Sequence, residues 1–353
     1  MRSSDFKKAA LLALALVLIA IACWELYLRN DDIKPAYDDG EDLWSNKRGM
    51  VYEPKDKSTV FIGSSRIKYD LDIDTWKKIT EEHAIQLAIE GECPRPLLED
   101  LGNDKNFKGK LIIDVTETLF FSSSPFTITR PGKYVTYFKK RTPAQLASFQ
   151  LNRLLESGLV FLDKDNFSLN TMLGKLHIPN RKGVFSPPFD FPLELGRVSY
   201  SRQNIMMDRF LTDTALLGQA TGLWLFYDKI NDEAPVSGDS LDHVLQRVKN
   251  AVDKIRQRGG QVLFVRTPSS GYYWPTEQKN FPREKYWDRL LSYTNSPGIH
   301  FIDHKETDHF ILPEWSHMSQ PQAIEFTKSF IKILEEKGWE FPHKQNNTNS
   351  KNL

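Results

Sequence analysis

Residues 240–267, SLDHVLQRVKNAVDKIRQRGGQVLFVRT, decide the fold class. In the first part of this stretch apolar residues recur at spacings of three and four, which predicts a helix over 240–258 with one buried face. Asp239 or Ser240 can cap the start of the helix, and Gly259-Gly260 can end it. The apolar run QVLFVRT follows at once and has the length of a strand. The stretch therefore predicts one unit of helix and strand.

Other parts of the chain repeat this pattern. Short apolar runs predict four more strands, at 59–63, 84–89, 110–115 and 299–303, and a further helix begins near Gln320-Pro321. Strands that are apolar throughout are typical of a parallel sheet covered on both faces. Alternating strands and helices predict an α/β fold: a three-layer α/β/α sandwich with a mostly parallel five-stranded sheet.

Changes in composition along the sequence divide the chain into segments. Residues 29–57 are polar and charged, which predicts a linker, and residues 58–340 form the predicted α/β domain. Within that domain residues 122–238 are an expected insertion, with helices at 143–157 and 202–227 and a loop rich in proline and phenylalanine at 183–192. Such an insertion can act as a lid or a docking surface. We expect residues 341–353 to be a disordered tail.

Composition excludes several classes of protein. Of 353 residues, 26% are charged and 40% hydrophobic, which excludes a wholly disordered or fibrous chain. Lys and Arg number 47 against 46 for Asp and Glu, so no net field favours nucleic acid as a partner. Two cysteines, Cys23 and Cys93, are too few for a disulfide framework or a cysteine zinc site.

The N-terminus carries the strongest local signal. Residues 9–23, AALLALALVLIAIAC, are fifteen consecutive apolar residues, and 9–28 would form a helix of about 30 Å, enough to cross a bilayer. Basic residues before this run predict that residues 1–28 are a signal anchor with a cytoplasmic N-terminus and an outward-facing body. A cleaved signal ending at Ala22 and a lipidated Cys23 are the alternatives. All three place the body across the membrane.

Candidate chemistry lies where the predicted strands end, because ligands bind beyond the carboxyl ends of parallel strands. The first strand is followed by Gly63-Ser64-Ser65, where glycine permits a sharp turn and a serine begins the next helix. A serine hydroxyl becomes a nucleophile when an imidazole, itself oriented by a carboxylate, accepts its proton. We take Ser65 as the candidate nucleophile, with Ser64 as the alternative.

The candidate base lies between the last strand and the last helix. Glu314 and His317 are three residues apart, so one turn can bring the carboxylate to the imidazole. His304 and His309 are alternatives, but neither directly precedes a helix. A metal site built from this acidic and histidine-rich segment is a weaker interpretation, since its spacing matches no helical histidine pair. We therefore expect no metal and no cofactor.

Together these motifs resemble the SGNH (GDSL-like) hydrolase and acyltransferase superfamily, over residues 58–121 and 240–338. The resemblance implies that Ser65 is the nucleophile, that Glu314 stands in the place of the family's aspartate and that His317 is the base. It also implies an oxyanion hole formed by Ser65 and Gly91. The family's third block usually contains an asparagine that this chain lacks, and Thr116 or a backbone N–H can replace it.

The divergent third block and the N-terminal anchor resemble the envelope-modifying branch of that superfamily, which includes membrane-anchored D-alanine transfer proteins and polysaccharide O-acetyltransferases. The resemblance implies a serine esterase or O-acyltransferase that acts on an acylated glycan or envelope polymer at the bilayer. Arg66, Arg266 and Ser269 are candidate substrate contacts. The rival hypothesis is a non-catalytic scaffold that binds polymer or a membrane acyltransferase partner through the insertion.

Overall fold

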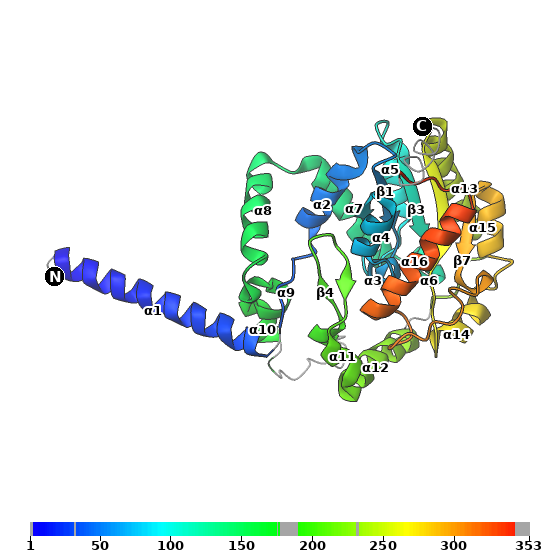
Figure 1. The fold of residues 1–353 in the computed structure, drawn as a ribbon. Coiled ribbons are helices and arrows are strands. Elements are labelled where there is room, and N and C mark those ends of the chain that lie inside the picture. Colours follow the sequence, from blue (N-terminus) through cyan, green and yellow to red (C-terminus); the bar gives the residue numbers. More distant parts are fainter. Residues whose placement is uncertain (1–2, 32, 175, 177–189, 231–232, 343–353) are drawn as a thin grey trace, which may run out of the picture. The chain divides into compact units, whose positions relative to one another are not determined.

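The computed structural model describes residues 3–31, 33–174, 176, 190–230 and 233–342 (Figure 1). The chain falls into two compact units. We call residues 1–38 with 143–186 the helical unit, and residues 39–142 with 187–353 the sheet unit.

The sheet unit is built on five parallel strands, as the sequence predicted. They are β1 (Ser58–Ile62), β2 (His83–Gln86), β3 (Lys110–Asp114), β6 (Gln261–Arg266) and β7 (Gly298–His300), in the order β2-β1-β3-β6-β7. The predicted positions are confirmed, with two differences at the ends. β2 ends three residues early, and residues 301–303 form the 3-10 helix η4 (Phe301–Asp303) instead of continuing β7.

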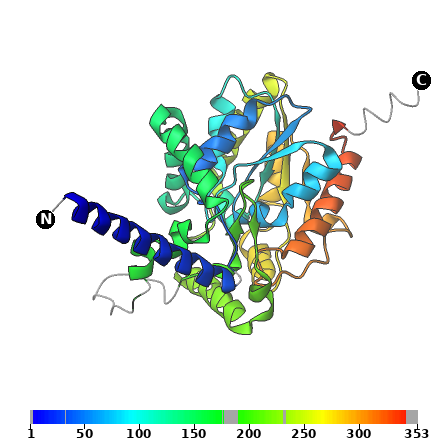
Figure 2. The same cartoon turned by 60° about the vertical axis from the view of Figure 1, so that its left-hand side comes forward.

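Helices cover both faces of this sheet because neighbouring side chains of each strand point to opposite sides. Ile62, Ile113 and Phe264 pack in one apolar cluster with α5 (Arg95–Asn103), α13 (Gly238–Gln257) and α15 (Trp287–Thr294). Phe61, Ile112 and Leu263 pack in a second cluster with α3 (Ser65–Asp70), α4 (Ile73–Thr80) and α16 (Gln320–Glu336). Figure 2 shows α16, in orange-red, against one side of the strands.

Part of the predicted linker belongs to the core, so the prediction of a linker over 29–57 was wrong for its second half. Residues 41–52 form α2 (Glu41–Arg48) and the 3-10 helix η1 (Gly49–Tyr52). Trp44 is 1% exposed and its indole N–H donates to the carbonyl of Leu87 at 2.9 Å. Arg48 is also buried and its charge is balanced by Asp100 at 2.9 Å. Polar composition hid this segment because its charges are paired rather than solvated.

The predicted insertion is divided between the two units. Its first helix, α7 (Pro125–Lys140), packs on α2 and α5 in the sheet unit, where it follows α6 (Glu117–Phe120). Its last part also belongs to the sheet unit, with these elements: η3 (Leu193–Leu195), the hairpin β4 (Arg197–Val198) and β5 (Asn204–Ile205), α11 (Asp208–Thr212) and α12 (Thr214–Ile230). The predicted helix over 202–227 was therefore wrong at its start, where Arg202 has a positive φ of 66° and leads into β5.

The remaining elements of the sheet unit follow β6. Helix α14 (Tyr273–Asn280) lies between β6 and α15. At the C-terminus Phe341 is 1% exposed and belongs to the core, one residue beyond the predicted limit. Most of the predicted loop at 183–192, and residues 343–353 of the predicted tail, lie outside the described residues.

The helical unit contains the N-terminal helix and the middle of the predicted insertion. Its elements are α1 (Ser3–Asn30), α8 (Pro143–Glu156), the 3-10 helix η2 (Val160–Leu162), α9 (Lys164–Phe167) and α10 (Leu169–Gly174). By length and composition α1 can cross a membrane. Its C-terminal end is attached to the unit: both oxygens of Glu25 accept backbone hydrogen bonds, from Val160 and Phe161, at 3.0 Å.

Candidate active site

The first component of the candidate site is the turn after β1. A Cβ atom at Gly63 would lie 2.6 Å from the Cβ of Asp114, so only glycine allows the ends of β1 and β3 to approach this closely. Ser64 then caps α3, and Ser65 is the first residue of that helix. Close packing of two strand ends thus places both serines at the carboxyl edge of the sheet.

The two serines have different surroundings. The Ser64 hydroxyl is buried and lies 2.8 Å from the Thr116 hydroxyl, which itself donates to Asp114 at 3.2 Å. Since the Thr116 proton is directed to Asp114, Ser64 is the donor in the first of these bonds. Ser65 is partly exposed, and its Oγ lies 2.8 Å from Nε2 of His317. The geometry favours Ser65 over the alternative, Ser64.

The second component is the loop that carries Glu314 and His317. Oε1 of Glu314 lies 3.0 Å from Nδ1 of His317 and also accepts the backbone N–H of His317 at 2.6 Å. Trp315, between them, has a φ of 74°, and this left-handed residue closes the turn. Because a carboxylate only accepts, Nδ1 carries the imidazole proton and Nε2 faces Ser65 as an acceptor.

Two contacts hold this loop on the core. The N–H of Met318, next to His317, donates to Asp70 at the end of α3 at 3.1 Å. Ser319 caps α16 in a reciprocal capping box with Gln322. The histidine is therefore fixed between the helix that carries Ser65 and the start of the last helix, although 252 residues separate it from Ser65.

Sequence reasoning missed Trp224, which completes the surroundings of Glu314. This tryptophan lies on α12, and its indole N–H donates to Oε2 of Glu314. Its ring packs 4.5 Å from Phe191 and 5.9 Å from the imidazole of His317, centroid to centroid. A tryptophan in a largely apolar helix gives no signal of such a partner in sequence.

Tyr69 is a second aromatic neighbour of the histidine that the sequence did not indicate. Its ring lies 4.3 Å from that of His317, and burial raises the pKa of its hydroxyl well above the usual value. Tyr69 is therefore neutral and packs against the imidazole face without competing for its nitrogens. Together Tyr69 and Trp224 restrict the ring of His317 from two sides.

The residues expected to bind substrate lie inside the protein, around a buried carboxylate. Arg66, Arg266 and Ser269 are 3%, 1% and 3% exposed, and all three bond to the carboxylate of Glu277 on α14. Burial alone would raise the pKa of Glu277, but the two guanidinium groups outweigh it and lower the pKa to about 2. The three residues form an internal ion-pair network, and this placement does not support a substrate contact.

Arg66 links that network to the loop that carries Glu314 and His317. Its Nε donates to the hydroxyl of Ser316, the neighbour of His317, at 3.3 Å. The guanidinium thus supports the loop from inside the protein. A basic residue directly after a candidate nucleophile suggested an anion contact, but its side chain turns inward to the acid on α14.

In addition to Ser65, the residues Gly91 and Thr116 were expected to donate hydrogen bonds to the oxyanion, and the structure gives these two residues different surroundings. Gly91 lies in the loop after β2 with a positive φ of 67°, and a Cβ atom there would meet nothing within 4 Å. That loop is attached beside the nucleophile turn because the N–H of Ile89 donates to the carbonyl of Gly63 at 3.2 Å. The hydroxyl of Thr116 donates to Asp114, so this arrangement does not offer it to an oxyanion.

The structure does not support the alternative histidines as the base, and it does not support the metal interpretation. His309 contacts the carbonyl of Lys305 at 3.2 Å, and Asp303 forms an ion pair with Arg283 at 2.6 Å. Within residues 3–342, apart from the gaps given above, no group of three or more His, Cys, Asp or Glu side chains is arranged to hold a metal ion.

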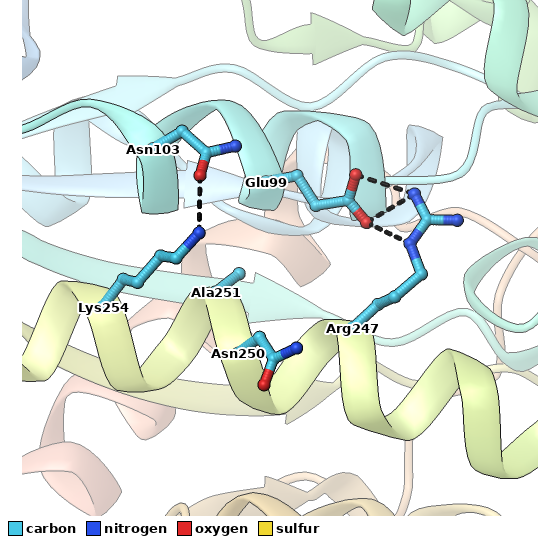
Figure 3. Close-up of a pocket in the computed structure, with 6 residues that line it drawn as sticks. All are labelled: Glu99, Asn103, Arg247, Asn250, Ala251 and Lys254. Atoms are coloured by element: carbon cyan, nitrogen blue, oxygen red, sulfur yellow. Dashed lines mark hydrogen bonds and ion pairs between the residues drawn. The ribbon is translucent and has the colours of Figure 1, made fainter.

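A shallow pocket lies elsewhere, between α5 and α13 (Figure 3). Its charged and polar groups are paired across the two helices: Arg247 bonds to both oxygens of Glu99 at 2.8 Å, and Lys254 bonds to Asn103 at 2.8 Å. No serine, cysteine or histidine lines this pocket.

No protein-family model matches the chain, and no curated protein matches it. Evidence for function therefore comes from the arrangement of the side chains described above.

Proposed function

We propose that the protein is a membrane-anchored serine esterase or O-acyltransferase that acts on an acylated cell-envelope polysaccharide or a related polymer. The observation that carries this proposal is the continuous hydrogen-bonded series Ser65–His317–Glu314, with 2.8 Å and 3.0 Å between its members. Its order of hydroxyl, imidazole and carboxylate is that of an activated serine nucleophile.

The proposed reaction has two halves. In the first, Oγ of Ser65 attacks the ester carbonyl while Nε2 of His317 accepts the serine proton, and the tetrahedral intermediate collapses to an acyl-serine. The departing alcohol takes the proton from His317. In the second half, water or a sugar hydroxyl attacks the acyl-serine, gives its proton to Nε2 and releases Ser65, whose oxygen recovers that proton. Glu314 keeps Nδ1 protonated throughout and stabilises the imidazolium.

Stabilisation of the oxyanion is assigned to backbone N–H groups. Ser65 begins a helix and Gly91 lies in an open, left-handed loop beside Gly63, so the N–H groups of these two residues are the proposed donors. Removal of one such donor typically lowers the rate about 100-fold to 1,000-fold. Two backbone donors would take over the function of the asparagine that the chain lacks.

Fold and topology support membership of the SGNH-like superfamily. When the five strands of this sheet are numbered by their order in the chain, they lie in the order 2-1-3-4-5, which is the order of flavodoxin-like doubly wound sheets. The candidate site lies at the switch point between β1 and β3. An anchor formed by α1, with the N-terminus in the cytoplasm, would hold the site near the outer surface of the membrane. This location favours envelope polymers as substrates.

Covalent labelling of the full chain with a fluorophosphonate tests the proposal. We expect the wild-type protein and Ser64→Ala to be labelled and Ser65→Ala to be unlabelled, because the probe reacts with an activated serine. Ser64→Ala is the matched control, one residue away with its hydroxyl buried. Labelling that persists in Ser65→Ala would reject the assignment of the nucleophile.

One observation favours the second candidate, a non-catalytic scaffold that binds polymer or a membrane acyltransferase. The Thr116 hydroxyl is directed to Asp114, so the expected side-chain oxyanion donor is lost. If the protein is such a scaffold, the wild-type protein, shown by circular dichroism to be folded, would not react with the fluorophosphonate probe.

A further inference from the structure

The outer face of α8 carries apolar side chains. Phe149 points into the helical unit and is 8% exposed, whereas Leu151, Leu154 and Leu155 are 65%, 64% and 51% exposed. Spacings of three and four residues place these leucines on one side of the helix. The helix therefore buries Phe149 and exposes an apolar side formed by these leucines.

Helix α10 and the residues after it have the same character. Leu169, Met172 and Leu173 share one side of α10 by the same spacing and are 72%, 42% and 49% exposed, and Leu176 is 59% exposed. We define the apolar face as these exposed side chains of α8 and α10: Leu151, Leu154, Leu155, Leu169, Met172, Leu173 and Leu176. Such a concentration in one small unit marks an interaction surface rather than scattered exposure.

The way α1 joins this unit indicates what covers the face. Residues 9–23 would extend about 22 Å as a helix, which is short of the roughly 30 Å of a hydrocarbon core. A complete crossing therefore needs Trp24–Leu28. Three of these residues contact protein: Leu28 is 3% exposed, Glu25 accepts from the backbone of η2, and the Trp24 ring contacts that of Phe167 on α9, whereas Leu26 and Tyr27 are 66% and 63% exposed.

It follows that η2 and α9 lie at the depth where α1 leaves the hydrocarbon. Helix α8 leads into η2, and α9 leads into α10, all within one compact unit. Figure 1 shows the end of α1 beside α9 and α10. The apolar face thus belongs to elements that are attached directly to the outer end of the membrane helix.

We infer that the apolar face of α8 and α10 binds the outer surface of the lipid bilayer that α1 spans. This inference rests on the proposed membrane anchor. An amphipathic helix at such a surface buries apolar side chains among the acyl chains just below the headgroups. Continuity with α1 selects lipid over a second copy of the chain, because membrane insertion of α1 brings these side chains to lipid without any further partner.

Site-specific photocrosslinking in the full chain tests this inference. The photoreactive residue p-benzoylphenylalanine replaces Leu16 in α1, Leu151 in α8, Met172 in α10 or, as a control, the exposed Gln145, which is not three or four residues from any leucine of the apolar face on α8. Each protein is reconstituted in vesicles of phosphatidylethanolamine and phosphatidylglycerol, irradiated and analysed by mass spectrometry for lipid adducts. All four side chains are exposed, so the replacements leave the packed interior unchanged.

We expect lipid adducts at 16, 151 and 172, with a several-fold lower yield at 145. Adducts at 16 alone would overturn the inference and leave the anchor intact, whereas absence of adducts at 16 would remove the anchor and the inference together. Equal yields at 151 and 145 would refute a specific face. Crosslinked protein dimers in place of lipid adducts at 151 would overturn it in favour of a second copy.

Discussion

Glu314 and Glu277 are two buried carboxylates in the sheet unit, and their partners differ. Glu314 accepts hydrogen bonds from the backbone and ring of His317 and from the indole of Trp224. Glu277 lies between the guanidinium groups of Arg66 and Arg266. The first carboxylate is oriented by neutral donors toward an imidazole, and the second neutralises two buried cations. Burial alone does not distinguish the proposed catalytic acid from a structural one, whereas the partners of the two carboxylates differ.

The largest effect that this comparison predicts is on reactivity, through Glu314→Gln. An amide in place of the carboxylate no longer enforces the tautomer with a proton on Nδ1 of His317. We expect the rate of fluorophosphonate labelling to fall about 1,000-fold to 10,000-fold. The rate constant of labelling, measured with the full chain at fixed probe concentration, checks this.

Glu277→Gln is the matched control for this change, because it makes the same substitution in the other carboxylate. Its labelling rate, measured where it is folded, should fall far less. An equal loss of labelling in the two variants would break the comparison.

The next largest predicted effect is a loss of stability in the variant Glu277→Gln. The substitution removes the carboxylate that two buried guanidinium groups share: Arg66 loses its ion pair, and Arg266 keeps only its pair with Glu117 at 3.2 Å. Breaking a buried ion pair in this way typically costs about 3–5 kcal/mol in the free energy of unfolding. Chemical denaturation followed by circular dichroism measures the change. A loss of less than about 1 kcal/mol would show that water or other acids replace the carboxylate.

Acid should remove the contributions of two groups to stability, in two stages. Burial, together with Arg266 and Arg283, lowers the pKa of His300 to about 3, so its neutral form stabilises the fold above pH 6.5 and this stability is lost as the pH falls from 6.5 toward 3. The pKa of Glu277 is lowered to about 2, so its contribution is present above about pH 4.5 and is lost toward pH 2. Each stage has a slope of at most about 1.4 kcal/mol per pH unit.

Denaturation curves at a series of pH values separate the two stages. We expect the stability of His300→Gln to fall less than that of the wild-type protein between pH 6.5 and 4.5, and the stability of Glu277→Gln to fall less below pH 4.5. Each variant is compared with the wild type because burial raises the pKa of Glu92 and of Glu156 to about 7, and these carboxyls contribute a dependence of opposite sign above pH 4.5. An equal pH dependence of His300→Gln and the wild-type protein between pH 6.5 and 4.5 would contradict the assignment to His300.

The contrast between the two carboxylates also shows what a sequence can reveal. Apolar runs and glycine punctuation predicted all five strands, because a sheet covered on both faces imposes that pattern. Ser65, Glu314 and His317 could be chosen because each follows a strand or precedes a helix, and topology brings strand ends to one edge. Similar positions, at or just after the ends of strands, are occupied by Arg66, Arg266 and Ser269. The sequence does not show that the side chains of these three residues bond to the buried carboxylate of Glu277.

Two further regions could not be predicted for a related reason. The segment around Trp44 was interpreted as a linker because its polar composition does not show that Arg48 pairs with Asp100. Trp224 is separated from Glu314 by 90 residues, and a single indole N–H determines its importance. Long-range polar pairs leave no periodic pattern in a sequence, whereas strands and amphipathic helices do.

Trp224→Phe gives the smallest expected effect and tests how neutral donors support the proposed catalytic carboxylate, Glu314. Phenylalanine keeps an aromatic ring against Phe191 and His317 but removes the hydrogen bond to Oε2 of Glu314. A hydrogen bond to a charged group contributes about 1.5–3 kcal/mol, so we expect labelling to slow about 10-fold to 100-fold. A double-mutant cycle with Glu314→Ala distinguishes positioning from packing. If Trp224 acts through Glu314, its replacement should have no further effect in the Glu314→Ala background; an additive loss would show that the ring acts by packing alone.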